Sequence, residues 1–352
     1  MVLLGFAAVF FSGFICGVAP LPIKFMRSFR YEHWGLLSSF LAFLAIPAVA
    51  LCVLCPDVRG ALADMPARPL VVANLLSFAW GVANILYLLS LVKIGFSLGQ
   101  GILSGIAIPA GVLVPMVVKG SGVFASAPAL GSVPGIVICA GVAIMVASVA
   151  MISRAGFGRE RSLTGGGIPA NGRGGFAAGL AMSVAAGVLS LGVSFSFVYT
   201  QDPIGQVFAA HGVAERDVPT AVRIVTLLGG TAANLLYPVF LLCRNRSWGV
   251  FFECGAWREA LLAVPFAVLT ILSFGAGSVG MVMMGALGSS VGFGVSLAMQ
   301  IVSAQSIGLL FGEWKGVERR YTRLMVAALA LMLLGLAVIS AGQAIRQQWF
   351  PP

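Results

Sequence analysis

Charged residues are scarce in this sequence, and their scarcity excludes an ordinary soluble protein. Only 9% of the 352 residues are Asp, Glu, Lys or Arg, whereas 59% are hydrophobic and the mean hydropathy is +1.03. A typical soluble domain has about 25% charged residues. A chain of this composition has too few charges to cover a water-facing surface, so we expect it to function within a membrane.

The sequence also lacks any polar segment long enough to form a soluble domain. The longest gaps between apolar stretches, at 56–69, 119–132, 154–175 and 200–220, leave no room for an ATPase module, a sensor or an attached enzyme. A hydrocarbon core about 30 Å thick needs about 20 apolar residues per helix. The sequence therefore predicts an all-α polytopic protein with ten membrane spans: Val2–Ile23, Trp34–Cys55, Leu70–Leu91, Phe96–Val118, Val133–Ser153, Phe176–Tyr199, Ala221–Cys243, Ala260–Met284, Ser289–Gly312 and Leu324–Ile345.

Metal-binding and redox motifs are missing as well. Cys52 and Cys55 form a CxxC pair, but no second pair or nearby histidine completes a site. We interpret the six cysteines as small buried hydrophobic residues, and we expect no metal, no cofactor and no enzymatic activity. A polytopic membrane enzyme is a distant alternative, since it would need a surface cluster of His, Asp or Glu that the sequence does not have.

The net charge of +10 indicates membrane orientation rather than binding to nucleic acid. Fifteen of the 21 Lys and Arg residues fall in one set of alternate loops, and six fall on the other side of the predicted spans. Basic residues concentrate in cytoplasmic loops. This distribution predicts cytoplasmic loops for the set of fifteen and periplasmic positions for both termini. We take the first apolar stretch to be a retained helix, because no basic segment precedes it.

The basic, glycine-rich segment 154–175 predicts a cytoplasmic linker between two halves, residues 1–153 and 176–352. Five spans in each half would make the second half inverted relative to the first. Short similarities, such as Ser77–Gly81 with Ser273–Gly277, are compatible with a repeat. Inverted repeats are typical of secondary transporters, whose substrate site lies near the midplane between the halves.

Several segments resemble the L-rhamnose–proton symporter family, a branch of the drug/metabolite transporter superfamily. The segments are Trp80–Tyr87 (WGVANILY), Lys93–Gly99 (KIGFSLG), Gly229–Leu235 (GGTAANL) and Gly312–Trp314 (GEW). The resemblance extends over nearly the whole chain, although each motif alone is short. It implies ten helices, an inverted five-plus-five architecture and ion-coupled uptake of a small sugar.

Polar and aromatic residues inside the predicted spans are the candidates for a substrate site, because polar groups in hydrocarbon usually face the bundle interior or a cavity. Sugars need amides that donate and accept hydrogen bonds, and an aromatic face. The predicted substrate-binding residues are Trp80, Asn84, Tyr87, Ser97, Gln100, Asn234, Gln300 and Ser303. The alternative for these side chains is hydrogen bonding between helices as part of their packing.

Coupling to an ion gradient needs a titrating group or an ion site, and no carboxylate falls within a predicted span. Glu32 and His33, at the start of the second span, are the coupling candidates, although an acidic residue there is also typical of a helix N-terminus. Sodium held by carbonyls and hydroxyls would leave no acidic signature, so proton and sodium both remain open.

Together these patterns predict a secondary active transporter of the bacterial inner membrane. We expect it to take up a small neutral, L-rhamnose-like sugar with a cation, by alternating access of its two halves. A metabolite exporter or exchanger of the same superfamily is the alternative.

Overall fold

Every regular element in the described part of the chain is a helix, as the sequence predicts. The structure is a computed structural model that describes residues 2–94, 96–163, 173–312 and 314–349. Within these residues, nine helical segments are long and apolar enough to cross a membrane, and a bent helix pair makes ten if it counts as one span. The protein is therefore an all-α, multi-pass membrane protein.

The helices of the amino-terminal part alternate long segments with short connections. They are α1 (Val2–Val18), η1 (Leu21–Phe25), α2 (Tyr31–Phe40), η2 (Leu41–Ala45), α3 (Ile46–Leu54), α4 (Val58–Ala63), α5 (Ala67–Ile94), α6 (Phe96–Val117), η3 (Gly122–Phe124) and α7 (Val133–Leu163). The second predicted span consists of α2, η2 and α3. Its middle section η2 is a single π-helical turn, a feature that is often found at functional sites.

The carboxy-terminal part contains more breaks than the sequence predicts. Its elements are α8 (Arg173–Leu189), α9 (Gly192–Ala210), α10 (Val218–Thr226), α11 (Leu228–Asn245), η4 (Trp248–Phe252), α12 (Ala256–Met283), η5 (Gly285–Leu287), η6 (Gly288–Gly292), α13 (Phe293–Leu310) and α14 (Arg319–Trp349). The predicted sixth span divides into α8 and α9. The predicted seventh span divides into α10 and α11, which meet at an angle of 44°.

The predicted linker is shorter in the structure. Helix α7 continues to Leu163, ten residues beyond the predicted end of the fifth span at Ser153, and α8 begins at Arg173. The end of α7 is held in place, since the Arg159 guanidinium lies 5.7 Å from the centre of the Trp314 ring. The middle of the predicted linker lies outside the described residues, and the division into two halves stays a prediction.

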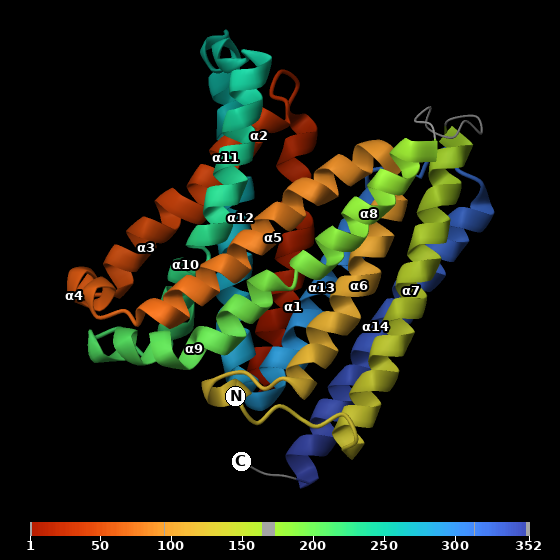
Figure 1. Ribbon diagram of the computed structural model, residues 1–352. Coiled ribbons are helices and arrows are strands. Elements are labelled where there is room, and N and C mark those ends of the chain that lie inside the picture. The colour runs from red at the N-terminus through yellow and green to blue at the C-terminus, as the bar shows by residue number, and fades with distance from the viewer. Residues whose placement is uncertain (1, 95, 164–172, 313, 350–352) are drawn as a thin grey trace.

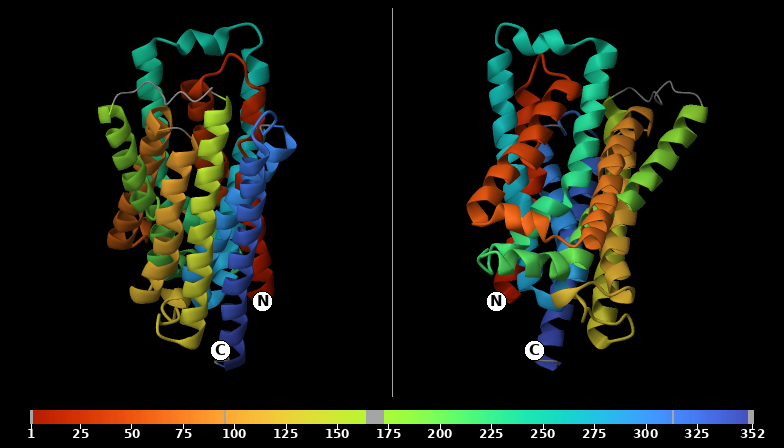
Figure 2. Two further views of the ribbon diagram at one scale, coloured as in Figure 1. Left: turned by 90° about the vertical axis from the view of Figure 1, so that its right-hand side faces the viewer. Right: turned by 60° about the vertical axis from the view of Figure 1, so that its left-hand side comes forward.

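Helices far apart in sequence pack side by side (Figures 1 and 2). α7 runs along α14 over most of its length, α1 packs on α12 and α13, and α5 contacts α8, α9 and α11. Glycines permit the close approaches: a Cβ on Gly13 of α1 would overlap the Ser296 carbonyl oxygen of α13. The start of α1 and the end of α14 lie at the same end of the bundle, as an even number of spans requires.

Candidate transport site

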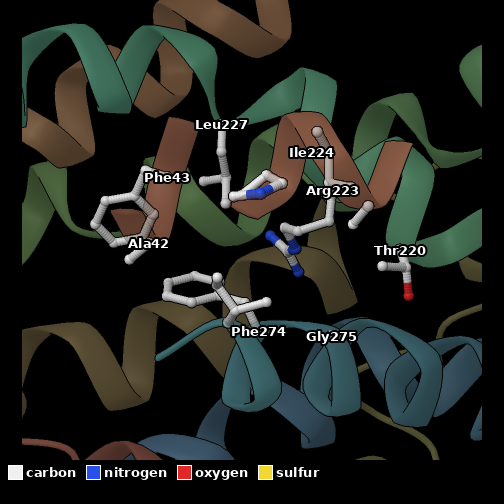
Figure 3. Close-up of a pocket in the computed structure, with 11 residues that line it drawn as sticks. Ala42, Phe43, Thr220, Arg223, Ile224, Leu227, Phe274 and Gly275 are labelled. Atoms are coloured by element: carbon white, nitrogen blue, oxygen red, sulfur yellow. The ribbon is translucent and has the colours of Figure 1, made fainter. Parts of the chain in front are cut away.

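A pocket opens where η2 and α3 face α10 and α12. Its cavity volume is about 50 Å³, so it is a narrow pocket, and it lies within about 470 Å³ of atom-free space that includes open solvent. The residues that line it are Ala42, Phe43, Pro47, Ala50, Thr220, Arg223, Ile224, Leu227, Ile271, Phe274 and Gly275 (Figure 3).

Three aromatic rings stand at one end of this pocket. Phe43, Trp80 and Phe274 contact one another edge to face, with ring centres 5.7 to 5.9 Å apart. Edge-to-face contacts of this kind stabilise aromatic clusters and fix the ring planes. Trp80, which the sequence predicts as a substrate-binding residue, therefore lies beside the pocket, and its two aromatic partners line the pocket wall.

The break between α10 and α11 forms another side of the pocket and is stabilised by α5. The Asn74 amide group donates to the Val225 carbonyl at 3.2 Å, and its Oδ1 accepts from the Gly229 N–H at 2.7 Å. The Ser77 hydroxyl accepts from the Gly230 N–H at 3.2 Å. Backbone groups freed by a helix break in a membrane need such partners. Asn74 and Ser77 thus provide hydrogen-bond partners for the backbone groups that the helix break at the pocket leaves free.

Arg223 of α10 is the charged residue that lines the pocket. Its side chain is buried, and it donates from Nε to the Ser278 hydroxyl at 2.8 Å and from Nη1 to the Val193 carbonyl at 2.7 Å. Its guanidinium also lies 4.1 Å from the centre of the Phe197 ring. Within the described residues no carboxylate pairs with this cation. Arg223 is one of the six Lys and Arg residues outside the predicted cytoplasmic loops, and its position within the predicted span Ala221–Cys243 is the signal in the sequence that could have identified it.

The other predicted site residues form separate groups. The Asn84 amide on α5 donates to Asn234 Oδ1 on α11 at 3.2 Å, and Asn234 donates in turn to the Gly230 carbonyl at 2.8 Å. Further along α5, the Tyr87 hydroxyl donates to Gln100 of α6, whose amide donates to the Ser104 hydroxyl at 2.9 Å. These two groups connect α5 to helices of both sequence halves.

None of the seven predicted substrate-binding residues whose side chains are described lines the pocket itself, and three of the eight predicted residues belong to none of the groups above. Ser303 lies on α13 and donates to the Met299 and Gln300 carbonyls of its own helix, where it faces Gly17 of α1. Gln300 lies one turn away on the same helix. The side chain of Ser97 lies outside the described residues. A substrate role for all three stays a prediction.

The two coupling candidates connect α2 to the hairpin between α11 and η4. Glu32 accepts from the Asn245 amide at 3.1 Å, and His33 Nε2 lies 2.9 Å from the Ser247 carbonyl. His33 Nδ1 accepts from the Arg30 N–H at 3.2 Å. Both ring nitrogens of His33 therefore face hydrogen-bonding backbone groups, an N–H at Nδ1 and a carbonyl at Nε2.

A second contact at the opposite end of the bundle involves His211, which follows α9. Its Nδ1 lies 3.0 Å from Asp57 and its Nε2 lies 3.0 Å from Asp64, on either side of α4. Only an imidazolium can donate to both carboxylates at once. The hydrogen bonds to Asp64 and Asp57 raise the pKa of His211 above its ordinary value. Protonated His211 therefore holds α4 against the end of α9.

This contact predicts a pH-dependent stability. Because the pKa of His211 is raised in the folded protein, its contribution is present below the unfolded pKa of about 6.5 and is lost as the pH rises through the folded value. We expect the melting temperature of the purified protein to fall as the pH rises above about 6.5 and through the folded pKa. The His211→Gln variant should show a flatter profile. Parallel profiles for the two proteins would exclude His211 as the titrating group.

The described residues contain no group of three His, Cys, Asp or Glu side chains that could hold a metal ion. The site thus consists of a buried arginine, three aromatic rings and a broken helix stabilised by amide and hydroxyl groups. Such an arrangement suits the binding of a small polar molecule, with guanidinium and hydroxyl donors for its oxygen atoms and rings for its apolar face.

This chain is similar in sequence to a family of sugar symporters and to several of its members. The family model described as L-rhamnose-proton symport protein (RhaT) matches residues 4–345. An L-rhamnose-proton symporter of Pectobacterium atrosepticum is 25% identical over 92% of this chain and 93% of its own length. Symporters of the same name from Cronobacter sakazakii, at 25% identity over 92% of each chain, and Salmonella paratyphi B, at 23% over 92% and 93%, are also similar. The resemblance inferred from the sequence motifs is confirmed, and the chain belongs to the L-rhamnose-proton symport protein family.

Proposed function

We propose that this protein is a secondary transporter that takes up a small sugar, of the kind that L-rhamnose represents, together with a proton. The observation that carries the proposal is a pocket with a buried arginine and an aromatic cluster, in a membrane chain that belongs to a family of sugar–proton symporters. The relatives named above support both the sugar and the proton.

The chemistry of the pocket supports a small sugar as the substrate. The Arg223 guanidinium and the Thr220 hydroxyl offer hydrogen-bond donors for ring oxygens and hydroxyls, and Phe43 and Phe274 offer apolar faces for the C–H side of a ring. The amide groups of Asn84, Asn234 and Gln100, together with Tyr87 and Trp80, extend this polar and aromatic set along α5. We propose that these side chains contact the sugar during its passage.

For coupling, we propose that Glu32 and His33 carry the proton. Glu32 accepts hydrogen bonds from Asn245 and, at 3.5 Å, from Ser247, so protonation of its carboxylate would weaken the contact between α2 and the α11–η4 hairpin. A contact that weakens on protonation is suited to opening one end of the pathway as the halves rock. Sodium is the alternative coupling ion, and it would need no titrating residue.

The substrate assignment is tested by counterflow in proteoliposomes. Vesicles loaded with unlabelled L-rhamnose should accumulate external labelled L-rhamnose, and a panel of unlabelled pentoses and hexoses should compete according to their similarity to it. Empty vesicles are the control. Absence of counterflow with every sugar of the panel would contradict a sugar substrate.

We further propose the bacterial inner membrane as the location, with both termini in the periplasm and the 154–175 segment in the cytoplasm. The fifteen-to-six distribution of Lys and Arg supports this orientation. Reporters fused after residue 165 and after Pro352 should show cytoplasmic and periplasmic activity, respectively. Cytoplasmic activity of the second fusion would reverse the orientation.

A further inference from the structure

The cation in the pocket lacks a counter-charge, and this bears on the substrate. Arg223 is 7% exposed, and in the described part of the chain no Asp or Glu forms an ion pair with it. The contacts of its guanidinium are a hydroxyl, a carbonyl and an aromatic ring, none of which carries a full negative charge. A buried charge is costly unless it is paired. Among the described residues, the pocket therefore has an uncompensated positive charge.

The guanidinium is also held in a fixed orientation, and its Nη2 group remains available to donate hydrogen bonds. Nε and Nη1 are fixed by the Ser278 hydroxyl and the Val193 carbonyl, and the plane rests on Phe197. Nη2 donates no hydrogen bond to a described residue. It is not fully buried either, so it remains accessible to a ligand. Figure 3 shows the guanidinium directed into the pocket, toward Phe274 and Gly275. A ligand in the pocket can thus reach a fixed, charged donor.

The opposite wall leaves space in front of this donor. A Cβ built on Gly275 of α12 would meet no atom within 4 Å. The other lining side chains are apolar apart from Thr220. Arginine presents a planar set of donors that matches the two oxygens of a carboxylate. The wall offers no acidic group that would repel an anion.

From this geometry we infer that the pocket prefers a sugar acid, a polyhydroxylated molecule with one carboxylate, over the neutral sugar of the same size. The carboxylate binds Arg223 and supplies the missing negative charge, while the hydroxyl-bearing part lies against Phe43 and Phe274. The inference rests on the proposed function, because the anion is taken to be a derivative of the sugar. It adds a second substrate class to the same site.

The test compares two open-chain ligands that differ at one carbon. L-Rhamnonate, the product of oxidising C1 of L-rhamnose, has a carboxylate where L-rhamnitol has a hydroxymethyl group. Thermal stabilisation of the purified full-length protein is measured over a concentration series of each ligand. A hydrogen bond to a charged group changes affinity by about tenfold to hundredfold, so L-rhamnonate should act at concentrations lower than L-rhamnitol by this factor. Acetate should stabilise only weakly, because it lacks the hydroxyls.

Arg223 variants assign the preference to the guanidinium. Arg223→Gln should remove the advantage of L-rhamnonate over L-rhamnitol, and Arg223→Lys should retain part of it, since the charge remains. If Arg223→Gln does not yield folded protein, the comparison of L-rhamnonate with L-rhamnitol on the wild type and on Arg223→Lys decides the question. Equal action of the two ligands on the wild type would overturn the inference, as would an advantage that survives in Arg223→Gln. Stabilisation by acetate equal to that by L-rhamnonate would also overturn it, by indicating a general anion site.

The outcome separates this inference from the proposed function. Counterflow of L-rhamnose without any preference for L-rhamnonate would leave the proposed function standing and overturn the inference alone. Binding of L-rhamnonate that depends on Arg223, without L-rhamnose counterflow, would support the inference and replace the neutral sugar as substrate.

Discussion

Replacing Gly229 with alanine is expected to lower the melting temperature of the purified protein by several degrees and to abolish uptake. A Cβ at this position would overlap the backbone carbonyl oxygen of Asn74, which belongs to helix α5 and has little freedom to move. Forcing an extra methyl group into a packed interior costs about 1–3 kcal/mol. The displaced backbone would also lose the hydrogen bond from the Gly229 N–H to Asn74 Oδ1.

Gly105→Ala is the matched control for this change. Gly105 lies within α6, and a Cβ there would meet only Val149 Cγ1 at 3.9 Å, an ordinary contact. Both substitutions replace a helical glycine with alanine, which by itself favours the helix by up to about 1 kcal/mol, so a loss of stability confined to Gly229→Ala reports the clash. If the two variants melt at the same temperature, the close contact of α5 with the α10–α11 break does not contribute to stability as we describe.

Asn84→Ala and Gln100→Ala are expected to abolish sugar transport while leaving the amount of protein in the membrane unchanged. Each loses an amide that would bind the sugar, which corresponds to about 1–3 kcal/mol, or roughly tenfold to hundredfold in affinity. Both amides also bond to protein groups in this structure: Asn84 donates to Asn234, and Gln100 donates to Ser104. The same residues could therefore serve mainly to join helices.

Two measurements on these variants distinguish binding from packing. A binding role predicts a raised apparent KM for counterflow and a nearly unchanged melting temperature. A packing role predicts the reverse. Ser340→Ala is the control, because among the described residues the Ser340 hydroxyl donates only to the Leu336 carbonyl of its own helix α14. Unchanged affinity in both variants would remove Asn84 and Gln100 from the site.

Composition and hydropathy were sufficient to predict the all-helical membrane fold and nearly all of its spans. Apolar runs of span length have few alternatives in a bilayer, because backbone polar groups must be satisfied within the segment. The breaks were not predicted. At the α10–α11 junction the freed backbone groups bond to Asn74 and Ser77, about 150 residues earlier in the chain. Hydropathy gives no information about such long-range partners.

The candidate site was predicted only in part, for a related reason. Polarity at membrane depth identified Trp80 but could not show that Phe43 and Phe274 surround it, since ordinary apolar residues carry no signal of function. Arg223 was assigned to the basic residues on the outer side of the predicted spans, and its burial inside the bundle was therefore not predicted. Ser303 illustrates the opposite case: its hydroxyl is satisfied by its own helix, so a polar residue within a span need not face a substrate.

The most direct test of proton-coupled sugar uptake is the movement of protons when sugar is added. Non-energised cells that contain the protein are suspended in a weakly buffered medium, and the external pH is recorded as L-rhamnose is added. Coupled uptake predicts a rise in external pH that a protonophore removes and that control cells lack. His33→Gln should lose this pH change and still catalyse counterflow. Entry of labelled L-rhamnose without any change in external pH would contradict proton coupling and favour sodium.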